Sequence, residues 1–166
     1  INLVASILGV KAGLIMRITR DNMEVFLRSD NEENPYPFDG KDQLGHGLYC
    51  ETVIGENREL YIDNSLYSKA WQDNPDVELE MFSYYGLPIK NPDGTFFGTI
   101  CALDNKTMEN SDKYRGLLDQ FRSSIESDLK ICQMNEELER RGKPPTRSLK
   151  LLPIPYHMTC DHPCGL

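Results

Sequence analysis

Apolar residues are concentrated in two strand-length runs near the middle of the chain, Phe82–Lys90 and Phe96–Asp104. Between them, Asn91-Pro92-Asp93-Gly94 supplies the proline and glycine of a reversing turn, so the runs predict a β-hairpin. Each run is almost continuously apolar, which is typical of strands that are covered on both faces. Gly86 and Gly98 interrupt the runs, and a glycine inside a strand often marks the close approach of another group.

The residues before the hairpin predict shorter elements. Apolar residues at helical spacing predict a helix over Asn2–Val10, and two strand-like runs, Leu14–Thr19 and Met23–Arg28, flank an Asp-Asn turn. Residues 30–47 are polar and rich in proline and glycine, which predicts a long loop. The remaining predicted elements are a helix over Leu48–Ile54, a short strand within Arg58–Asp63, and one or two helical turns over Leu66–Trp71 capped by Asn64-Ser65.

One long helix is predicted over Ser111–Arg141, where apolar residues recur every three or four positions and no proline occurs. At 1.5 Å per residue it would extend roughly 45 Å, which exceeds the width of a small domain. Its second half carries Ile131, Met134 and Leu138 among charged residues, a stripe too thin for a core face. We therefore expect a homodimer through the terminal helices, with this half forming a short coiled coil. The alternative is a helix that folds back on its own domain.

Three parts follow from this pattern: a core over residues 1–110, the long helix over residues 111–141, and a proline-rich linker or tail over residues 142–166. No apolar run approaches the length of a membrane span, and nothing at the start resembles a signal peptide, so we expect no membrane contact. The first residue is Ile rather than Met, which favours a piece of a longer protein.

The charge and the cysteines narrow the function classes further. The chain carries 18 Lys and Arg against 26 Asp and Glu, a net charge of −8, and such an acidic domain is a poor nucleic-acid binder. Cysteine occurs five times, an odd number, and Cys50, Cys101 and Cys132 lie in apolar patterns. Reduced thiols in a cytoplasmic protein are the simplest interpretation.

The hairpin sequence YGLPIKNPDGTFFGTICALD resembles the last hairpin of GAF domains, and GLYCETVIGENRELYIDNSLYSKAWQDNP resembles the helix, strand and loop before it. The resemblance extends in order over residues 1–135. It implies an α+β fold with a central antiparallel sheet, helices on both faces and a long C-terminal helix. It also implies a sensory module of a bacterial signalling protein, such as a histidine kinase or diguanylate cyclase, that relays a signal to an output domain outside this sequence.

A ligand pocket is implied by the same resemblance. In GAF domains this region closes a pocket over one face of the sheet, and here it is rich in aromatic residues, which suit a small organic ligand. The expected ligand-binding residues are Tyr61, Asp63, Tyr67, Trp71, Phe82, Tyr84 and Cys101. Alternatively, the aromatic residues simply fill the pocket, as in GAF domains kept for dimerisation. The sequence identifies neither the ligand nor a cofactor.

Cys50 raises an enzymatic alternative. One GAF family, the free methionine-(R)-sulfoxide reductases, has a cysteine at this helix start, and His46 lies four residues earlier, within reach if the helix begins early enough. That family also needs a catalytic cysteine in the loop before the hairpin, and no cysteine lies between Cys50 and Cys101. With no partner thiol expected for Cys50, we predict that the chain is not an enzyme. A redox enzyme of this reductase type using Cys50 is the alternative.

The tail gathers four residues of zinc-ligand type, His157, Cys160, His162 and Cys164, within eight positions. Structural zinc sites usually use two separated pairs on rigid turns, and four ligands this close in an extended segment can rarely all face one ion. We therefore expect adventitious metal affinity here and no built metal site.

Overall fold

The computed structural model describes residues 1–109 and 111–142, so the His157–Cys164 cluster lies outside the described residues. The chain divides into two compact units, residues 1–131 and residues 132–166. The first unit contains a six-stranded antiparallel sheet in the spatial order β3-β2-β1-β6-β5-β4. Its strands are β1 (Ala12–Ile18), β2 (Asn22–Arg28), β3 (Lys41–Gln43), β4 (Leu60–Ile62), β5 (Ser83–Lys90) and β6 (Phe96–Asp104).

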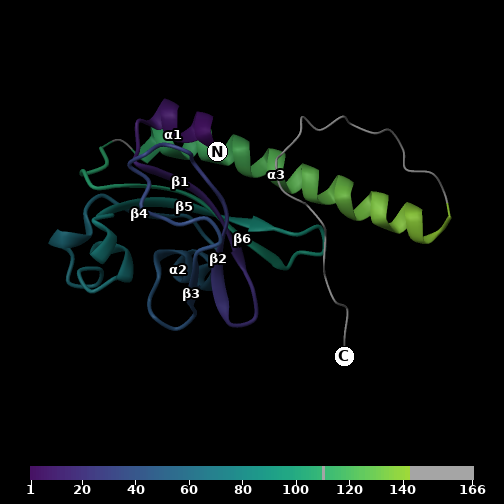
Figure 1. Cartoon of the computed structure of the whole chain (residues 1–166), viewed down its shortest axis with the longest axis horizontal. Coiled ribbons are helices and arrows are strands. Elements are labelled where there is room, and N and C mark those ends of the chain that lie inside the picture. The colour runs from purple at the N-terminus through teal and green to yellow at the C-terminus, as the bar shows by residue number, and fades with distance from the viewer. Residues whose placement is uncertain (110, 143–166) are drawn as a thin grey trace. The chain divides into compact units, whose positions relative to one another are not determined.

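Helices cover both faces of this sheet (Figure 1). The helices are α1 (Asn2–Leu8), α2 (Tyr49–Glu56) and α3 (Ser111–Arg140), with 3₁₀ turns η1 (Ser65–Tyr67) and η2 (Pro75–Leu79). Helix α2 packs on one face, and α1 and the first half of α3 pack on the other. The predicted α+β class, with an antiparallel sheet between helices and a long C-terminal helix, is confirmed.

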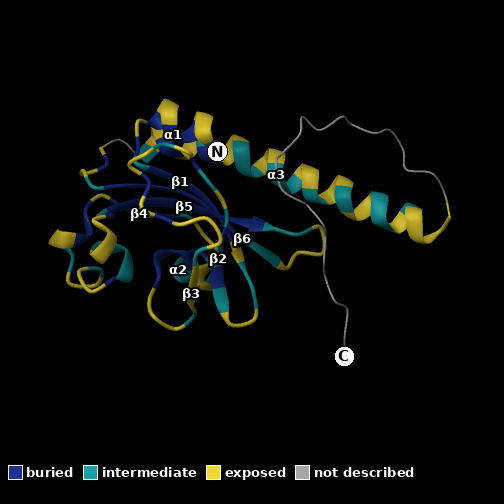
Figure 2. Cartoon of the chain, viewed as in Figure 1, coloured by how far each residue is buried: buried dark blue, intermediate teal, exposed yellow. Residues whose placement is uncertain are grey.

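The central hairpin of β5 and β6 has the predicted form. At the turn, Gly94 has φ 87° and its N–H donates to the Asn91 carbonyl at 2.9 Å. In β5 only Lys90 is not fully buried, and β6 is buried from Gly98 to its end, as the dark blue strands of Figure 2 show. Because both faces are covered, neither strand has a polar side that alternates with an apolar one.

Two glycines of the hairpin are required by what lies against them. A Cβ at Gly98 would stand 1.8 Å from the backbone oxygen of Met16 on the neighbouring strand β1. A Cβ at Gly86 would stand 2.1 Å from the hydroxyl of Tyr84, because the Tyr84 ring lies along its own strand and covers Gly86. Gly98 therefore permits the β1–β6 approach, and Gly86 makes room for a buried tyrosine.

The predicted loop over residues 30–47 contains the edge strand β3. It pairs with β2 in the register Asn22↔Gln43 and Glu24↔Lys41, and Lys41 Nζ lies 2.9 Å from Glu24 Oε1. All of β3 is exposed and polar, so no apolar run marks it. A short polar strand is typical of a sheet edge, where it discourages further pairing.

The connection between β4 and β5 is built from 3₁₀ turns, where a short helix was predicted. Asn64, and not Ser65, caps η1, since its side-chain oxygen accepts the Leu66 N–H at 3.0 Å. Asn74-Pro75 opens η2, with Asn74 Oδ1 accepting the Asp76 N–H at 2.9 Å. Asn74 Nδ2 also donates to the Gly47 carbonyl at 2.7 Å, which ties this connection to the start of α2.

Helix α3 begins where predicted and ends one residue earlier, at Arg140. Tyr114 and Leu118 are buried against the sheet, and half-buried apolar residues continue the stripe; these are Leu117, Phe121, Ile125 and Leu129. Further along, Ile131 is 39% exposed and Met134 is 54% exposed. The dimer through these residues stays a prediction. None of the described helices is long and apolar enough to cross a membrane.

The two glycines Gly98 and Gly116 give opposite predictions for stability. Gly98→Ala should lower the free energy of unfolding by about 3 kcal/mol, because the new Cβ meets backbone that cannot move aside. Gly116→Ala should raise it by about 1 kcal/mol, because Gly116 lies in α3 with open space around it and alanine favours helix. Denaturant unfolding of both variants checks this, and a neutral Gly98→Ala would contradict the described β1–β6 contact.

Candidate functional site

A small, partly open cavity lies between α2 and the sheet. Its volume is about 20 Å³, enough for a single water molecule. Apolar residues of β1, β2 and β6 form part of its wall. The remaining wall is unusual in its chemistry, because it gathers ionisable side chains from five separate segments; these are Tyr36, Asp42, Cys50, Asp76, Tyr84 and Cys101.

Asp76 and Tyr36 form a hydrogen-bonded pair at this cavity. The Tyr36 hydroxyl donates to Asp76 Oδ1 at 2.6 Å, and the Tyr36 side chain is buried. Burial raises the pKa of Asp76 to about 6, although the hydrogen bond from Tyr36 opposes the shift. The η2 cap by Asn74 fixes the backbone of Asp76, so a structural motif positions this carboxyl.

Cys50 lies at the centre of a second group of contacts. Its Sγ accepts a hydrogen bond from Thr99 Oγ1 at 3.2 Å and lies 3.4 Å from the Tyr84 hydroxyl. Cys101 lines the same cavity as Cys50, and both thiols are free. Hydrogen bonds, first from Cys101 and then from Thr99 and Tyr84, lower the pKa of Cys50, while burial raises the pKa of Cys101. His46 is exposed and lies before the first turn of α2, away from this group.

A stack of aromatic rings adjoins the cavity through Tyr84. The Tyr49 and Tyr84 ring centroids are 4.9 Å apart, and the Tyr49 and Trp71 centroids are 5.4 Å apart. Trp71 is half-buried and packs against Tyr49, and neither of these two rings lines the cavity. Burial raises the pKa of Tyr49 to about 12, so this hydroxyl stays protonated at neutral pH.

The seven residues predicted to bind a ligand occupy different positions. Tyr84 and Cys101 line the cavity. Trp71 is half-buried against the core on the α2 face, and Phe82 is half-buried just before β5. The others, Tyr61, Asp63 and Tyr67, are exposed, with Tyr67 at 88%. Tyr61 stacks near Tyr85 at a centroid distance of 6.2 Å, and Tyr85 belongs to the core on the α3 face. Ligand contact by these residues stays a prediction.

Sequence reasoning missed Tyr36, Asp76 and the proximity of the two thiols. Tyr36 stands between two prolines in a polar segment, and an aromatic residue in such a segment is a signal of burial. Asp76 follows Asn74-Pro75, a pattern that places it in the first turn of a capped helix. The shared cavity of Cys50 and Cys101 corrects the expectation that no partner thiol would stand near Cys50. The two cysteines are distant in sequence, and only the packing of α2 over β6 brings them together.

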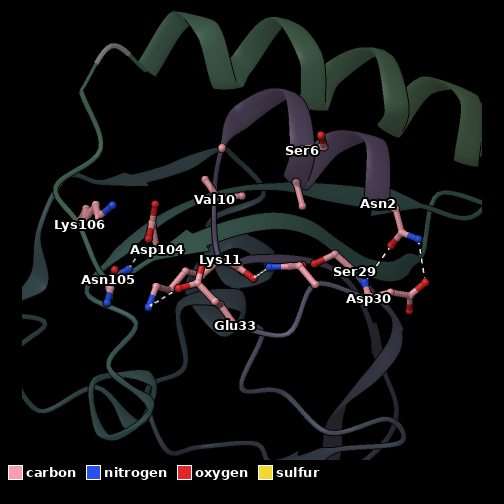
Figure 3. A pocket seen from close by; sticks show the side chains of 13 residues that line it. Asn2, Ser6, Val10, Lys11, Ser29, Asp30, Glu33, Asp104, Asn105 and Lys106 are labelled. Carbon is pink, nitrogen blue, oxygen red and sulfur yellow. Dashed lines mark hydrogen bonds and ion pairs between the residues drawn. The ribbon is translucent and has the colours of Figure 1, made fainter.

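A larger hollow lies on the surface beside α1 and the ends of β2 and β6 (Figure 3). Its volume is about 660 Å³, and several of its charged side chains contact their neighbours. Lys11 Nζ lies 3.5 Å from Glu33 Oε1, and Asn2 Nδ2 donates to Asp30 Oδ2 at 2.8 Å. These pairs occupy groups that would otherwise face a ligand, so the α2-face cavity is the stronger candidate.

Comparison with known structures decides the fold. The GAF domain of an Acinetobacter phosphoenolpyruvate-protein phosphotransferase superposes with a TM-score of 0.61 at 14% identity, over 85% of this chain and 80% of that chain. The GAF domain of a two-component sensor histidine kinase from Bacillus halodurans gives 0.59 at 12% identity, over 86% and 95%. The chain has the GAF-domain fold. The chain spans 65% of the length of a GAF sensor structure from Burkholderia vietnamiensis.

At the level of sequence, no protein-family model matches, and no curated protein matches. Low identity to the GAF structures means that they establish the fold alone.

An enzyme shares this GAF fold. The type II free methionine-R-sulfoxide reductase from Thermoplasma acidophilum superposes with a TM-score of 0.59 at 10% identity, over 75% of this chain and 83% of that chain. The expectation that the chain is not an enzyme rested on the absence of a partner thiol for Cys50. The comparison contradicts it, because the same fold also serves catalysis.

Asp76 gives a pH prediction. Its pKa is about 6 in the folded chain against an ordinary 3.8, so folding takes up a proton between these values and stability falls as the pH rises through that window. Asp76→Asn keeps an oxygen for Tyr36 and removes the charge. At pH 7 the variant should be more stable than the parent by about 1–3 kcal/mol, and the difference should shrink toward zero near pH 4.

Denaturant unfolding across this pH range measures that difference. Asp73→Asn, which removes an exposed carboxyl from the same connection, is the matched control for the loss of charge. Parallel stability curves for the parent and Asp76→Asn would show that Asp76 is not buried as described.

Proposed function

We propose that this chain is a cytoplasmic GAF sensory module that binds a small molecule over the α2 face, dimerises through its terminal helices, and relays its state through α3. The observation that carries the proposal is the partly open cavity lined by ionisable groups, which converge there from loops as well as from the sheet. Buried polar groups cost stability, so their convergence is typical of a functional site.

The ligand class follows from the walls of the cavity. Aromatic rings and apolar strand residues favour a small, largely apolar molecule, and the Tyr84 hydroxyl and Asp76 carboxyl would orient its polar atoms. At about 20 Å³ the cavity is small, so a ligand larger than water must displace neighbouring groups such as Trp71 or the η2 connection. Both belong to the link between β4 and β5, which has only short 3₁₀ turns of its own.

Exposed apolar residues on the two terminal helices support the dimer. On α1, Leu3 is 59% exposed and Ile7 is 49% exposed. On α3, Ile131 and Met134 are exposed among charged residues, in a helix that is otherwise strongly polar. A second copy of the same helix can bury such a thin stripe without any rearrangement of the rest of the domain.

The contacts of β5 support the relay. Tyr84 faces the cavity, and the next residue, Tyr85, faces α3. The Tyr85 ring lies 6.3 Å from that of Tyr114, and its hydroxyl donates to Glu59 Oε2 at 2.6 Å. Glu59 in turn accepts from Arg115 Nε at 2.8 Å. A shift of β5 at the cavity would thus be felt in the first turns of α3.

Native mass spectrometry of the full chain tests ligand binding and dimerisation together. We expect a dimer that carries a co-purifying small molecule. Trp71→Ala should lower the ligand occupancy about tenfold and leave the dimer intact, because it loosens the aromatic stack beside the cavity. Replacing Ile131 and Leu138 together with Glu should give monomers that keep the ligand.

Ser124→Glu with Gln133→Glu adds the same charge to α3 at polar positions and is the matched control. A parent chain that is monomeric at high concentration would refute the dimer. A dimeric parent without any bound molecule, in preparations that retain the fold, would leave dimerisation as the only supported activity and refute ligand binding.

A reductase is the second candidate, because an enzyme of that class shares the fold and because Cys50 and Cys101 line one cavity. If the chain reduces free methionine sulfoxide, turnover should require a thiol reductant and should fall at least a hundredfold in Cys50→Ser, with Cys132→Ser as the control. The assay follows the R and S epimers separately by chromatography. Turnover in the parent that survives Cys50→Ser would exclude a mechanism through this cysteine.

A further inference from the structure

We propose that Cys50 and Cys101 form a hydroperoxide-sensitive dithiol, whose oxidation to a disulfide links the start of α2 to the central strand β6. The proposal does not depend on a small ligand or on reductase turnover, because the stimulus is a hydroperoxide and the product is a modified chain.

The packing of Tyr84 determines where the two thiols meet. The Tyr84 hydroxyl lies over Gly86, and Gly86 is the β5 residue directly opposite Cys101 in the β5–β6 register. Cys50 Sγ lies 3.4 Å from that hydroxyl. The same sulfur lies 3.2 Å from Thr99 Oγ1, and Thr99 is two residues before Cys101 on the same face of β6. Cys50 is therefore held over the Thr99–Cys101 segment from two directions.

The two cysteines share one cavity. Cys50 and Cys101 both line a space of about 20 Å³. Hydrogen peroxide is the smallest hydroperoxide, so it is the oxidant that requires the least widening of this space. Cys50 is 8% exposed and Cys101 is 0% exposed, so an incoming oxidant reaches Cys50 first.

The surroundings give the two cysteines different roles. Cys50 has three hydrogen-bonding neighbours that stabilise its thiolate and lower its pKa, whereas burial keeps Cys101 protonated by raising its pKa. The Asp76 carboxyl lines the same cavity and can accept a proton. Cys50 is thus the attacking sulfur and Cys101 the resolving one.

The chemistry balances in two steps. The Cys50 thiolate attacks one oxygen of hydrogen peroxide, the O–O bond breaks, and Cys50 sulfenic acid and hydroxide form, the latter taking up a proton to leave as water. The Cys101 sulfur then attacks the Cys50 sulfur, the S–O bond breaks, and the second oxygen leaves as water with the Cys101 proton. Two thiols and one peroxide give one disulfide and two waters.

The disulfide would change the cavity wall. Thr99 and Tyr84 would lose the thiol that they now contact, and α2 would be joined covalently to the strand beside β5. Because Tyr49 precedes Cys50 and stacks on Trp71, the change would reach the only tryptophan of the chain.

A full chain with Cys132, Cys160 and Cys164 replaced by serine retains only the proposed pair. After treatment with stoichiometric hydrogen peroxide, denaturation and alkylation, we expect the intact mass to show the loss of two hydrogen atoms and no added alkyl group. A peptide map should contain one Cys50–Cys101 crosslink that dithiothreitol reverses, and Trp71 fluorescence should change in parallel.

Single variants assign the roles. Cys101→Ala should trap sulfenic acid at Cys50, seen as an adduct with a 1,3-diketone, and Cys50→Ala should leave Cys101 unmodified. The proposal is overturned if both thiols alkylate fully after peroxide treatment that oxidises Cys132 in the unmodified chain. It is also overturned if Cys50 proceeds to sulfinic acid while Cys101 is present. These outcomes come from chains with the pair intact, so a single variant that fails to fold does not affect them.

Discussion

The structure depends on the burial of β1, β5 and β6 on both of their faces. Strands in this position must satisfy every backbone hydrogen bond within the sheet, because water reaches neither side. The pairing of β1 with β6 and of β6 with β5 does this along nearly their whole length. The close approach that such pairing needs is possible only because Gly98 presents no side chain to the carbonyl of Met16.

Burial on both faces also makes β5 a divider between two different environments. On the α3 face, the core is made of aliphatic and aromatic side chains from α1, α3 and the sheet. On the α2 face, thiols, phenols and a carboxyl are included among the apolar residues. Ionisable groups of this kind weaken a core unless each has a partner. Here the partners are one another, as in the Tyr36–Asp76 pair and the contacts of Cys50.

The sequence was informative where burial imposes a long, regular pattern. The hairpin and α3 follow from apolar runs and from helical spacing, and both are found within a residue or two of their expected bounds. The polar strand β3 has no such pattern, since ion pairs and backbone pairing hold it at the sheet edge.

The candidate site was predicted only in part, because some of its residues also lie outside any regular apolar pattern. Tyr84 and Cys101 lie in patterned strands, whereas Tyr36 and Asp76 reach the cavity from loops whose paths depend on long-range contacts such as Asn74 with Gly47.

The small size of the cavity constrains how the module can respond. A ligand larger than water binds only after Trp71 or its connection has moved, so the cost of that movement is subtracted from its affinity. Hydrogen peroxide is only slightly larger than water and needs a smaller opening, and its effect is stored in a covalent bond rather than in occupancy. Both stimuli act on the same side chain, because the Tyr84 ring fills the space over Gly86 and contacts Cys50. Tyr84 is joined through the backbone of β5 to Tyr85 and its contacts with Tyr114. A response that reaches α3 therefore requires two discrete positions of β5 or of its side chains, since a strand packed on both faces cannot shift gradually.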